Sequence, residues 1–426
     1  MKKNELKYCN IIPLIGGMTI ANKLATNKDP EFIVSWEPFQ KNDSHIVNHL
    51  KTVPYHVIDA ELKEDQKSVT DNLKQHKGKI DFVSSVCPCA GLSMLNNSNS
   101  ATSAHARGSN AVQNDWMYKS SEWVLENLEP KVLWGENAPG LYTSLGKGVR
   151  DRLREIGARY GYSFSIVKTD TYLHGIPQHR KRTFYFFWKS KNAPLLEWVE
   201  RDSNAKDLIE YLKEVPKTAK YQESYFTKNS HKPVTDWKLY EFVLEKTGKT
   251  DLEFRSSYIG ALYHYVSNKG LVEEAIVWFD KNYPNYEGEE RRKLEHIKKK
   301  QELGLGFWDS SPFFVHSYTN AIIGKNMTTI VHPVEDRFLN MRECMHLMGL
   351  PHDFDFAEGN EIFNHIAQNV PVTTAKSYTE QVVKFVNGEL RDSGHQFIMQ
   401  NNMSQKITFA EKELKNKPKY KTNSVI

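Results

Sequence analysis

Short apolar runs alternate with amphipathic stretches along the first 188 residues of the chain. The runs are rich in β-branched and aromatic side chains, which is typical of buried strands. They include 80–83, 131–135, 163–167 and 183–188. Between them, residues 116–128 and 146–161 carry apolar positions at helical spacing. The alternation predicts an α/β fold, with a mostly parallel sheet and helices on both of its faces.

The N-terminal part opens with a strand–turn–helix–strand pattern. Its parts are an apolar run at 10–15, Gly16-Gly17, a helix-like stretch, and a second run at 31–36 that ends at Glu37. A third run ends at Asp59. Glycines let the backbone approach a ligand closely, and an acid at a strand end can accept hydrogen bonds from ribose hydroxyls. The pattern therefore predicts a nucleotide-binding crevice, although each acid could equally be an ordinary helix cap.

The character of the chain changes after Lys189. Residues 190–325 are charged and aromatic, with breaks at Asn, Pro and Gly, and they show no internal repeat. We expect them to form an inserted, smaller domain, in which the charge run EERRKLEHIKKK is a solvated helix face or, alternatively, a phosphate contact. Residues 327–390 should complete the first domain, which begins with 8–188. The Lys-rich stretch 391–426 is expected to be a frayed basic tail.

Composition limits the classes of protein that remain. With 39% hydrophobic and 26% charged residues, the chain has no apolar run approaching a membrane span, so we expect no membrane partner. The apolar stretch near the N-terminus is too short for an export signal. Four cysteines give neither a disulfide framework nor zinc spacing, which favours a reducing, cytoplasmic location and no metal. A net charge of +5 permits a polyanionic partner without requiring one.

Three short segments carry side chains suited to catalysis. Cys89 lies in Cys87-Pro88-Cys89, a proline-rigidified loop after the run at 80–83, where α/β folds place reactive groups. Glu136 directly follows the run at 131–135. Gln178, Arg180 and Arg182 alternate along one face of an entering strand. Each segment also has a plain structural interpretation: a buried thiol, a turn cap and a surface salt bridge.

Taken together, these segments resemble the cytosine-C5 DNA methyltransferases, whose motifs recur here in the family's order. The matching segments are Cys87–Ser93, Trp134–Asn137, Gln178–Arg182, Arg337–Pro351 and Gln368–Pro371. The resemblance covers residues 8–188 and 327–388, which leaves 190–325 in the position of the family's target-recognition domain. It implies a Rossmann-like methyltransferase domain that uses S-adenosylmethionine.

The resemblance also implies a role for each candidate residue. Cys89 would add to carbon 6 of cytosine and so make carbon 5 nucleophilic. Glu136 would contact N3 and the exocyclic amine, while Arg182, helped by Arg180, would orient Glu136 and the base carbonyl. The residues implied at the cofactor are Gly16, Gly17, Glu37, Asp59 and Pro88.

The implied substrate is double-stranded DNA with the target cytosine flipped out, acted on by a monomer, as in restriction-modification systems. Three alternatives remain: a tRNA cytosine-C5 methyltransferase, a different modification at carbon 5 through the same adduct, and a catalytically silent DNA-binding relative. Departures from the family pattern motivate the last of these. They are Asn10 for an acid, Ile12 for Phe, Leu14 for Gly, Ala90 for Gln, and Ala367-Gln368 for Gly-Asn.

Overall fold

A computed structural model of the chain describes residues 6–58, 63–93, 108–222, 237–248, 259–286, 288–304, 317–323, 330, 332–335, 338–357 and 363–409. The chain divides into two units. Residues 1–206 and 345–426 belong to the first, and residues 207–344 to the second. The expected boundaries were 190 and 325–327. The units instead divide at about 206 and 344, so each expected boundary is 10 to 20 residues too early in the chain.

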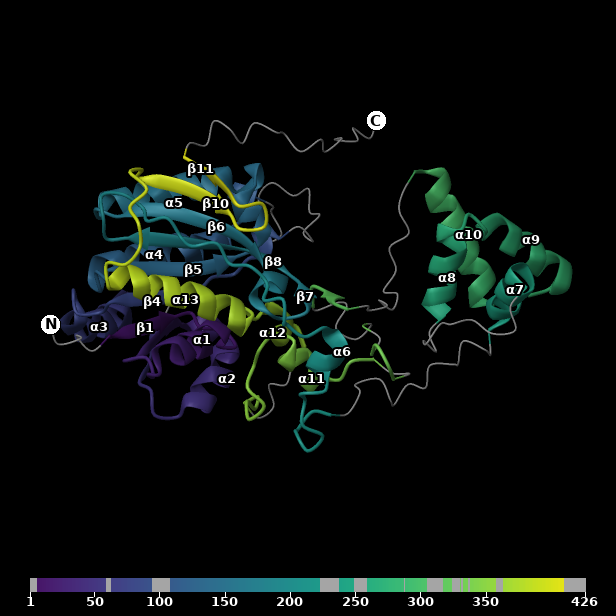
Figure 1. Cartoon of the computed structure of the whole chain (residues 1–426), viewed down its shortest axis with the longest axis horizontal. Helices are drawn as coiled ribbons and strands as arrows, with labels where there is room; N and C mark the ends of the chain where they lie inside the picture. Colours follow the sequence, from purple (N-terminus) through teal and green to yellow (C-terminus); the bar gives the residue numbers. More distant parts are fainter. Residues whose placement is uncertain are drawn as a thin grey trace. The chain divides into compact units, whose positions relative to one another are not determined.

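The first unit is built on a nine-stranded sheet with the strand order β11-β10-β6-β8-β5-β4-β1-β2-β3 (Figure 1). The strands are β1 (Tyr8–Ile11), β2 (Ile33–Trp36), β3 (Tyr55–Ile58), β4 (Phe82–Val86), β5 (Val132–Asn137), β6 (Ser163–Asp170), β8 (Lys181–Trp188), β10 (Phe397–Asn401) and β11 (Lys406–Thr408). β8 runs antiparallel to both β5 and β6, and β11 runs antiparallel to β10. The other pairings are parallel, which confirms the predicted mostly parallel sheet.

Helices cover both faces of this sheet. They are α1 (Gly17–Thr26), α2 (Gln40–Leu50), α3 (Lys63–Leu73), α4 (Asn114–Asn127), α5 (Lys147–Arg159), α12 (Phe363–Gln368) and α13 (Val372–Val386). The alternation of side chains along β8 shows the two layers. Phe184 packs against Tyr378 of α13. Phe187 points to the opposite face and packs against Gly157 of α5.

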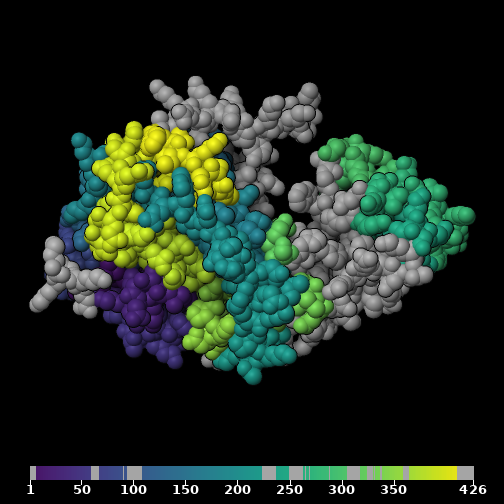
Figure 2. Space-filling view, viewed as in Figure 1, coloured from purple at the N-terminus to yellow at the C-terminus, as the bar shows by residue number. Residues whose placement is uncertain are grey.

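A buried polar network ties α1 and α13 to the centre of the sheet. Asn10 of β1 and Asn22 of α1 both donate to the Ser84 hydroxyl of β4. Thr379 of α13 donates to Asn22 at 2.8 Å. Helix α13 comes late in the chain and α1 early, and their surfaces lie side by side in Figure 2. The network thus fixes the returning part of the chain to the first strand.

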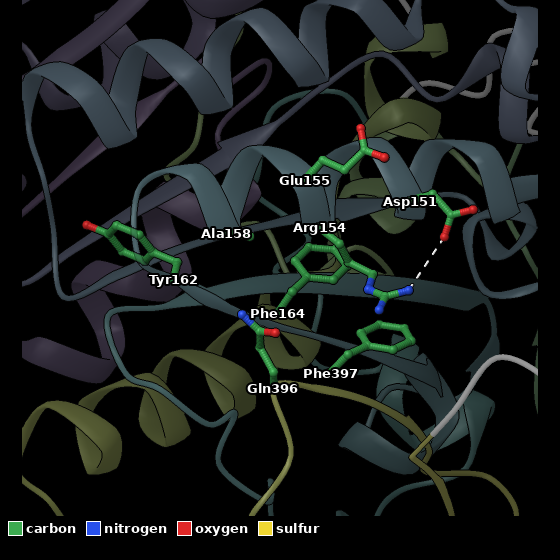
Figure 3. Close-up of a pocket in the computed structure, with 8 residues that line it drawn as sticks. All are labelled: Asp151, Arg154, Glu155, Ala158, Tyr162, Phe164, Gln396 and Phe397. Atoms are coloured by element: carbon green, nitrogen blue, oxygen red, sulfur yellow. Dashed lines mark ion pairs between the residues drawn. The ribbon is translucent and has the colours of Figure 1, made fainter.

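The stretch from residue 391 was expected to be a frayed tail, and for residues 391–409 that expectation is wrong. β10 pairs in parallel with β6, and its residues Phe397, Ile398 and Met399 are buried. The Arg154 guanidinium of α5 lies 4.3 Å from the Phe397 ring centroid, in a cavity of about 330 Å³ between α5 and the start of β6 and β10 (Figure 3). The apolar FIM triplet therefore adds a strand to the sheet edge, despite its Lys-rich surroundings.

The same strand explains why the first unit extends past residue 190. The backbone N–H of Leu196 donates to Gln400 Oε1 at 2.9 Å, and that of Val199 donates to Asn402 Oδ1 at 2.8 Å. These bonds hold residues 193–202 against the C-terminal strands.

The described part of the second unit is helical apart from the two-residue strand β9 (Thr319–Asn320). Its helices are α6 (Leu208–Leu212), α7 (Lys238–Thr247), α8 (Ile259–Asn268), α9 (Val272–Asn282) and α10 (Glu289–Glu302), and α11 (Met341–His346) spans its end. α7 to α10 enclose an apolar cluster that includes Phe242, Val266 and Phe279. The charge run forms α10, which buries Glu290, Leu294 and Ile297. Its solvated face, as expected, carries the exposed charges of Glu289, Arg292, Glu295 and Lys299. No helix in the described ranges is long and apolar enough to cross a membrane.

Candidate active site

Two neighbouring strands bring Cys89 and Glu136 to the same edge of the sheet. β4 pairs with β5 so that Val86 lies opposite Glu136, and the Cys89 loop follows directly. Cys89 is a half-buried free thiol, whereas Cys9, Cys87 and Cys344 are buried. Glu136 is only 3% exposed. Because both strands end at this edge, the Cys89 thiol lies close enough to the enclosed Glu136 carboxyl group for the two to interact electrostatically.

The reversed strand β8 supplies Arg182, the third residue of the site. Since β8 runs antiparallel to β5, its first residues lie beside the last residues of β5, with Thr183 opposite Asn137. This places Arg182 Nε 2.7 Å from Glu136 Oε1. The predicted contact between Arg182 and Glu136 is present in the structure.

Burial and the neighbouring charges shift the pKa values of Cys89 and Glu136. Burial raises the pKa of Cys89, the Glu136 charge raises it further, and Arg182 and Arg180 lower it. Burial also raises the pKa of Glu136, against the opposing effect of both arginines. Burial therefore shifts Glu136 towards its protonated form, and protonation would remove one of the charges that disfavour a Cys89 thiolate.

Arg180 differs from Arg182 in what its guanidinium contacts. Its side chain is 1% exposed, and Nη2 donates to the backbone carbonyls of Ala367 at 2.6 Å and Asn369 at 3.2 Å. Gln178, on the same face, donates to the Leu347 carbonyl at 2.8 Å. The alternation expected at 178–182 is present. Two of its three side chains hold the returning part of the chain.

The two glycines of the first turn are positions where no side chain fits. Gly16 has φ 105°, and a Cβ there would lie 2.5 Å from Ile46 Cγ1 of α2. A Cβ at Gly17 would lie 2.1 Å from the Val370 carbonyl oxygen. The Gly17 N–H, the first of α1, donates to Asn369 Oδ1 at 2.9 Å. Both glycines are thus required by packing beside the expected crevice.

Two residues before these glycines, Ile12 and Leu14, have positive φ angles, which glycine adopts most readily. Leu14 has φ 51° and Ile12 has φ 45°, both in the left-handed region that favours glycine. Leu14 is the position at which the family pattern has a glycine. The side chain has changed there while the backbone conformation remains one that glycine adopts freely.

The remaining cofactor candidates lie around this turn. Glu37 is exposed at the end of β2, and Pro88 is half-buried before Cys89. Asp59 lies outside the described residues, as does most of the polar segment after Ser93. A helix N-terminus beside an exposed strand-end carboxylate can hold a ligand with an anionic end and a ribose.

Two buried residues near this turn were missed in the sequence. Asn369 is 2% exposed, and its Nδ2 has no hydrogen-bond partner among the described residues. Its place just before Val370-Pro371, inside the last matching motif, is a signal that the sequence does carry.

Asp43 of α2 is fully buried and accepts a hydrogen bond from the Tyr55 hydroxyl at 3.1 Å. Burial raises the pKa of Asp43 to about 7. Asp43 lies in the mostly polar sequence of α2, which does not indicate that its carboxylate is buried.

Comparison with known proteins decides the family. Residues 15–384 match the family model of the C-5 cytosine-specific DNA methylases. The chain belongs to this family. The resemblance expected from the ordered motifs is thereby confirmed.

Named relatives of this methylase are distant. The chain is similar to Type II methyltransferase M1.BsuMI of Bacillus subtilis (strain 168), with 22% identity over 327 residues, 75% of this chain and 64% of that protein. It is 29% identical to Type II methyltransferase M.AgeI of Thalassovita gelatinovora over 122 residues, 29% of this chain and 26% of that protein. The chain thus spans less than two-thirds of either relative's length.

A solved structure of a methyltransferase shares the fold. The Entamoeba histolytica methyltransferase EhMeth superposes with a TM-score of 0.51 at 11% identity, over 90% of this chain and 99% of that one. At this identity the similarity shows the fold alone. It confirms the Rossmann-like methyltransferase architecture expected for the first unit.

Proposed function

We propose that this methylase transfers a methyl group from S-adenosylmethionine to carbon 5 of a cytosine flipped out of double-stranded DNA, through a covalent adduct with Cys89. The observation that carries the proposal is the convergence of the Cys89 loop, Glu136 and Arg182 at one edge of the sheet. Carbon 5 of cytosine is a poor nucleophile, and addition of a thiolate to carbon 6 turns it into an enamine carbon that can attack a methyl group.

Each of the three side chains has a step to perform. The Cys89 sulfur bonds to carbon 6, and it is eliminated after the proton on carbon 5 has left. Glu136, whose pKa is raised by burial, donates a proton to N3 or shares one with it, which draws electron density from the ring. Arg182 holds Glu136 through Nε, and its planar fork keeps further donors for the base carbonyl.

The donor site is assigned to the turn at 12–17 and to the end of β2. The N-terminus of α1 favours an anionic group, so it would bind the methionine end of S-adenosylmethionine. The exposed Glu37 carboxylate would accept hydrogen bonds from the ribose hydroxyls. The unpartnered Nδ2 of Asn369 lies in the same neighbourhood and fits a ligand that offers an acceptor. When bound, S-adenosylmethionine supplies the electrophilic methyl group.

The second unit is assigned to recognition of the DNA. Arg292, His296 and Lys299 are exposed at successive turns of α10, and Arg292 and Lys299 form no ion pair among the described residues. Such cations can contact phosphates, which position a protein on its site. The named relatives are type II methyltransferases, which supports DNA over RNA as the substrate and a role in restriction-modification.

The test is to trap the adduct on an oligonucleotide. A duplex bearing 5-fluorocytosine cannot lose its carbon 5 substituent as a proton, so a covalent protein–DNA species should survive denaturation when S-adenosylmethionine is present. The assay uses a pool of duplexes of varied sequence and, separately, fluorinated tRNA. Cys89→Ser should form no adduct. The matched control, Cys87→Ser, should still form it, because Cys87 is buried among Ser85 and Ser120.

The outcomes separate the alternatives. An adduct with duplex DNA that requires Cys89 supports the proposal. An adduct with tRNA alone would replace DNA by tRNA as the substrate. A trapped adduct whose cytosine carries a group other than methyl on carbon 5 would indicate another electrophile. No adduct with either nucleic acid would overturn the nucleophile and favour a silent binding protein.

A further inference from the structure

The segment that returns to the first unit contacts both halves of the site. Residues 363–371, here the return segment, include α12 and the turn that leads to α13. On one side, Asn369 Oδ1 accepts the Gly17 N–H at 2.9 Å. The contact is close, because a Cβ at Gly17 would lie 2.4 Å from the same Oδ1. The return segment therefore caps α1 directly.

On the other side, the return segment is held by Arg180. Its guanidinium donates to the carbonyls of Ala367 and Asn369, and these bonds are charge-assisted and buried. Arg180 lies two positions before Arg182, which pairs with Glu136. Residues 180–182 therefore link Glu136 to the return segment, which in turn contacts Gly17.

The turn at the end of this path needs an external hold. Ile12 and Leu14 occupy left-handed backbone conformations that cost free energy in residues other than glycine and persist only where the surroundings fix them. The Gly17 N–H is one of the four donors at the start of α1 that have no partner within the helix. Asn369 satisfies that donor and so fixes the point at which the strained turn enters the helix.

We propose that Asn369 and Arg180 are positioning residues of the methyl-donor site, acting through the return segment on the turn at 12–17. This rests on the proposed function in one respect: the ligand of that turn is taken to be S-adenosylmethionine. Asn369 holds the turn through its acceptor oxygen. Arg180 holds Asn369 through the backbone, which links the donor turn to the strand that carries Arg182.

The experiment measures donor binding and catalysis separately on the full chain. S-adenosylmethionine binding is measured by calorimetry, and KM for the donor and kcat are measured on duplex DNA. Asn369→Ala should raise the donor Kd and KM about tenfold, which corresponds to about 1.4 kcal/mol, and leave kcat at saturating donor within about twofold. Asn369→Asp keeps an acceptor for the Gly17 N–H but lacks the Nδ2 donor, so it should recover part of the affinity. Asn364→Ala, an exposed position in α12 of the return segment, is the matched control.

A double-mutant cycle tests the link to Arg180. Arg180→Lys cannot reproduce the two-carbonyl contact, so it should also raise the donor Kd. Combined with Asn369→Ala it should cost clearly less than the two single effects together, because both act through one segment. The melting temperature of each variant is recorded, and the conservative Asn369→Asp and Arg180→Lys carry the test if Asn369→Ala does not fold.

The results that would overturn the inference are distinct from those that would overturn the proposed function. Unchanged donor affinity in Asn369→Ala, or additive effects in the cycle, would end the positioning role while the wild type still binds the donor. Asn369→Asp binding as weakly as Asn369→Ala would show that the acceptor oxygen is not what matters. A wild-type protein that binds no S-adenosylmethionine would overturn the proposed function and the inference together.

Discussion

Arg182 Nε lies 2.7 Å from Glu136 Oε1, and the two side chains come from adjacent antiparallel strands. The two side chains shift the pKa of the nearby Cys89 thiol in opposite directions. Glu136 raises the pKa of Cys89, whereas Arg182 lowers it. The pair therefore adjusts the fraction of Cys89 that is thiolate, which is the nucleophilic form.

Changing either partner should shift the pH at which Cys89 reacts. Glu136→Gln removes a negative charge, so the pKa of Cys89 should fall. Arg182→Met removes a positive charge, so it should rise. The measurement is the rate of alkylation by iodoacetamide against pH, followed by mass spectrometry of the peptide that contains Cys89. The other three cysteines are buried and serve as internal controls. Two variants with the wild-type midpoint would contradict this electrostatic coupling.

Asp43 should make the protein less stable as the pH rises. An aspartate in the unfolded chain titrates near 4, whereas burial raises the pKa of Asp43 to about 7 in the folded protein. Between these values the folded state holds a proton that the unfolded state has lost, so the free energy of unfolding falls with increasing pH. Each unit of pKa difference corresponds to about 1.4 kcal/mol.

Urea unfolding of wild type and Asp43→Asn at several pH values checks this effect. The variant should show a flatter dependence between pH 4 and 7 and should be the more stable protein above pH 7. Its amide can still accept the Tyr55 hydroxyl. Asp71→Asn is the control, because that exposed carboxylate pairs with Lys74 and its pKa is lowered instead. Parallel curves for wild type and Asp43→Asn would rule out the buried titration.

The parts of the site that could be predicted from sequence are those in short contiguous motifs. Cys89, Glu136 and Arg182 each lie at the end of an apolar run, and strand pairing brings such ends together. The direction of β8 could not be predicted, because a run buried on both faces has the same pattern in either orientation. That reversal is what places Arg182 beside Glu136.

Other features depend on contacts between distant parts of the chain. Asn369 meets Gly17 across 352 positions, and no local pattern marks a side chain for such a contact. Asp43 sits in a helix whose polar composition suggests exposure, yet Tyr55 and the first turn enclose it. Strand β10 was overlooked because three apolar residues within a polar, Lys-rich stretch carry little signal until β6 is available as a partner.

Strand β10 should therefore be necessary for the fold of the first unit. Truncation after residue 390 removes the buried side chains of Phe397, Ile398 and Met399, each contributing about 1.5–3 kcal/mol. It also leaves the edge of β6 unpaired and frees the backbone at Leu196 and Val199. The total is comparable with the stability of a whole domain, about 5–15 kcal/mol, so this truncation should abolish cooperative thermal unfolding.

Two milder changes keep the test quantitative. Truncation after residue 409 keeps β10 and β11 and is the matched control. Phe397→Ala should destabilise by about 3–5 kcal/mol, because it empties the space between Phe164 and the Arg154 guanidinium. Differential scanning calorimetry on the three proteins gives the comparison. If the protein truncated after residue 390 melts cooperatively at the wild-type temperature, β10 is dispensable, and the sheet is complete at β6.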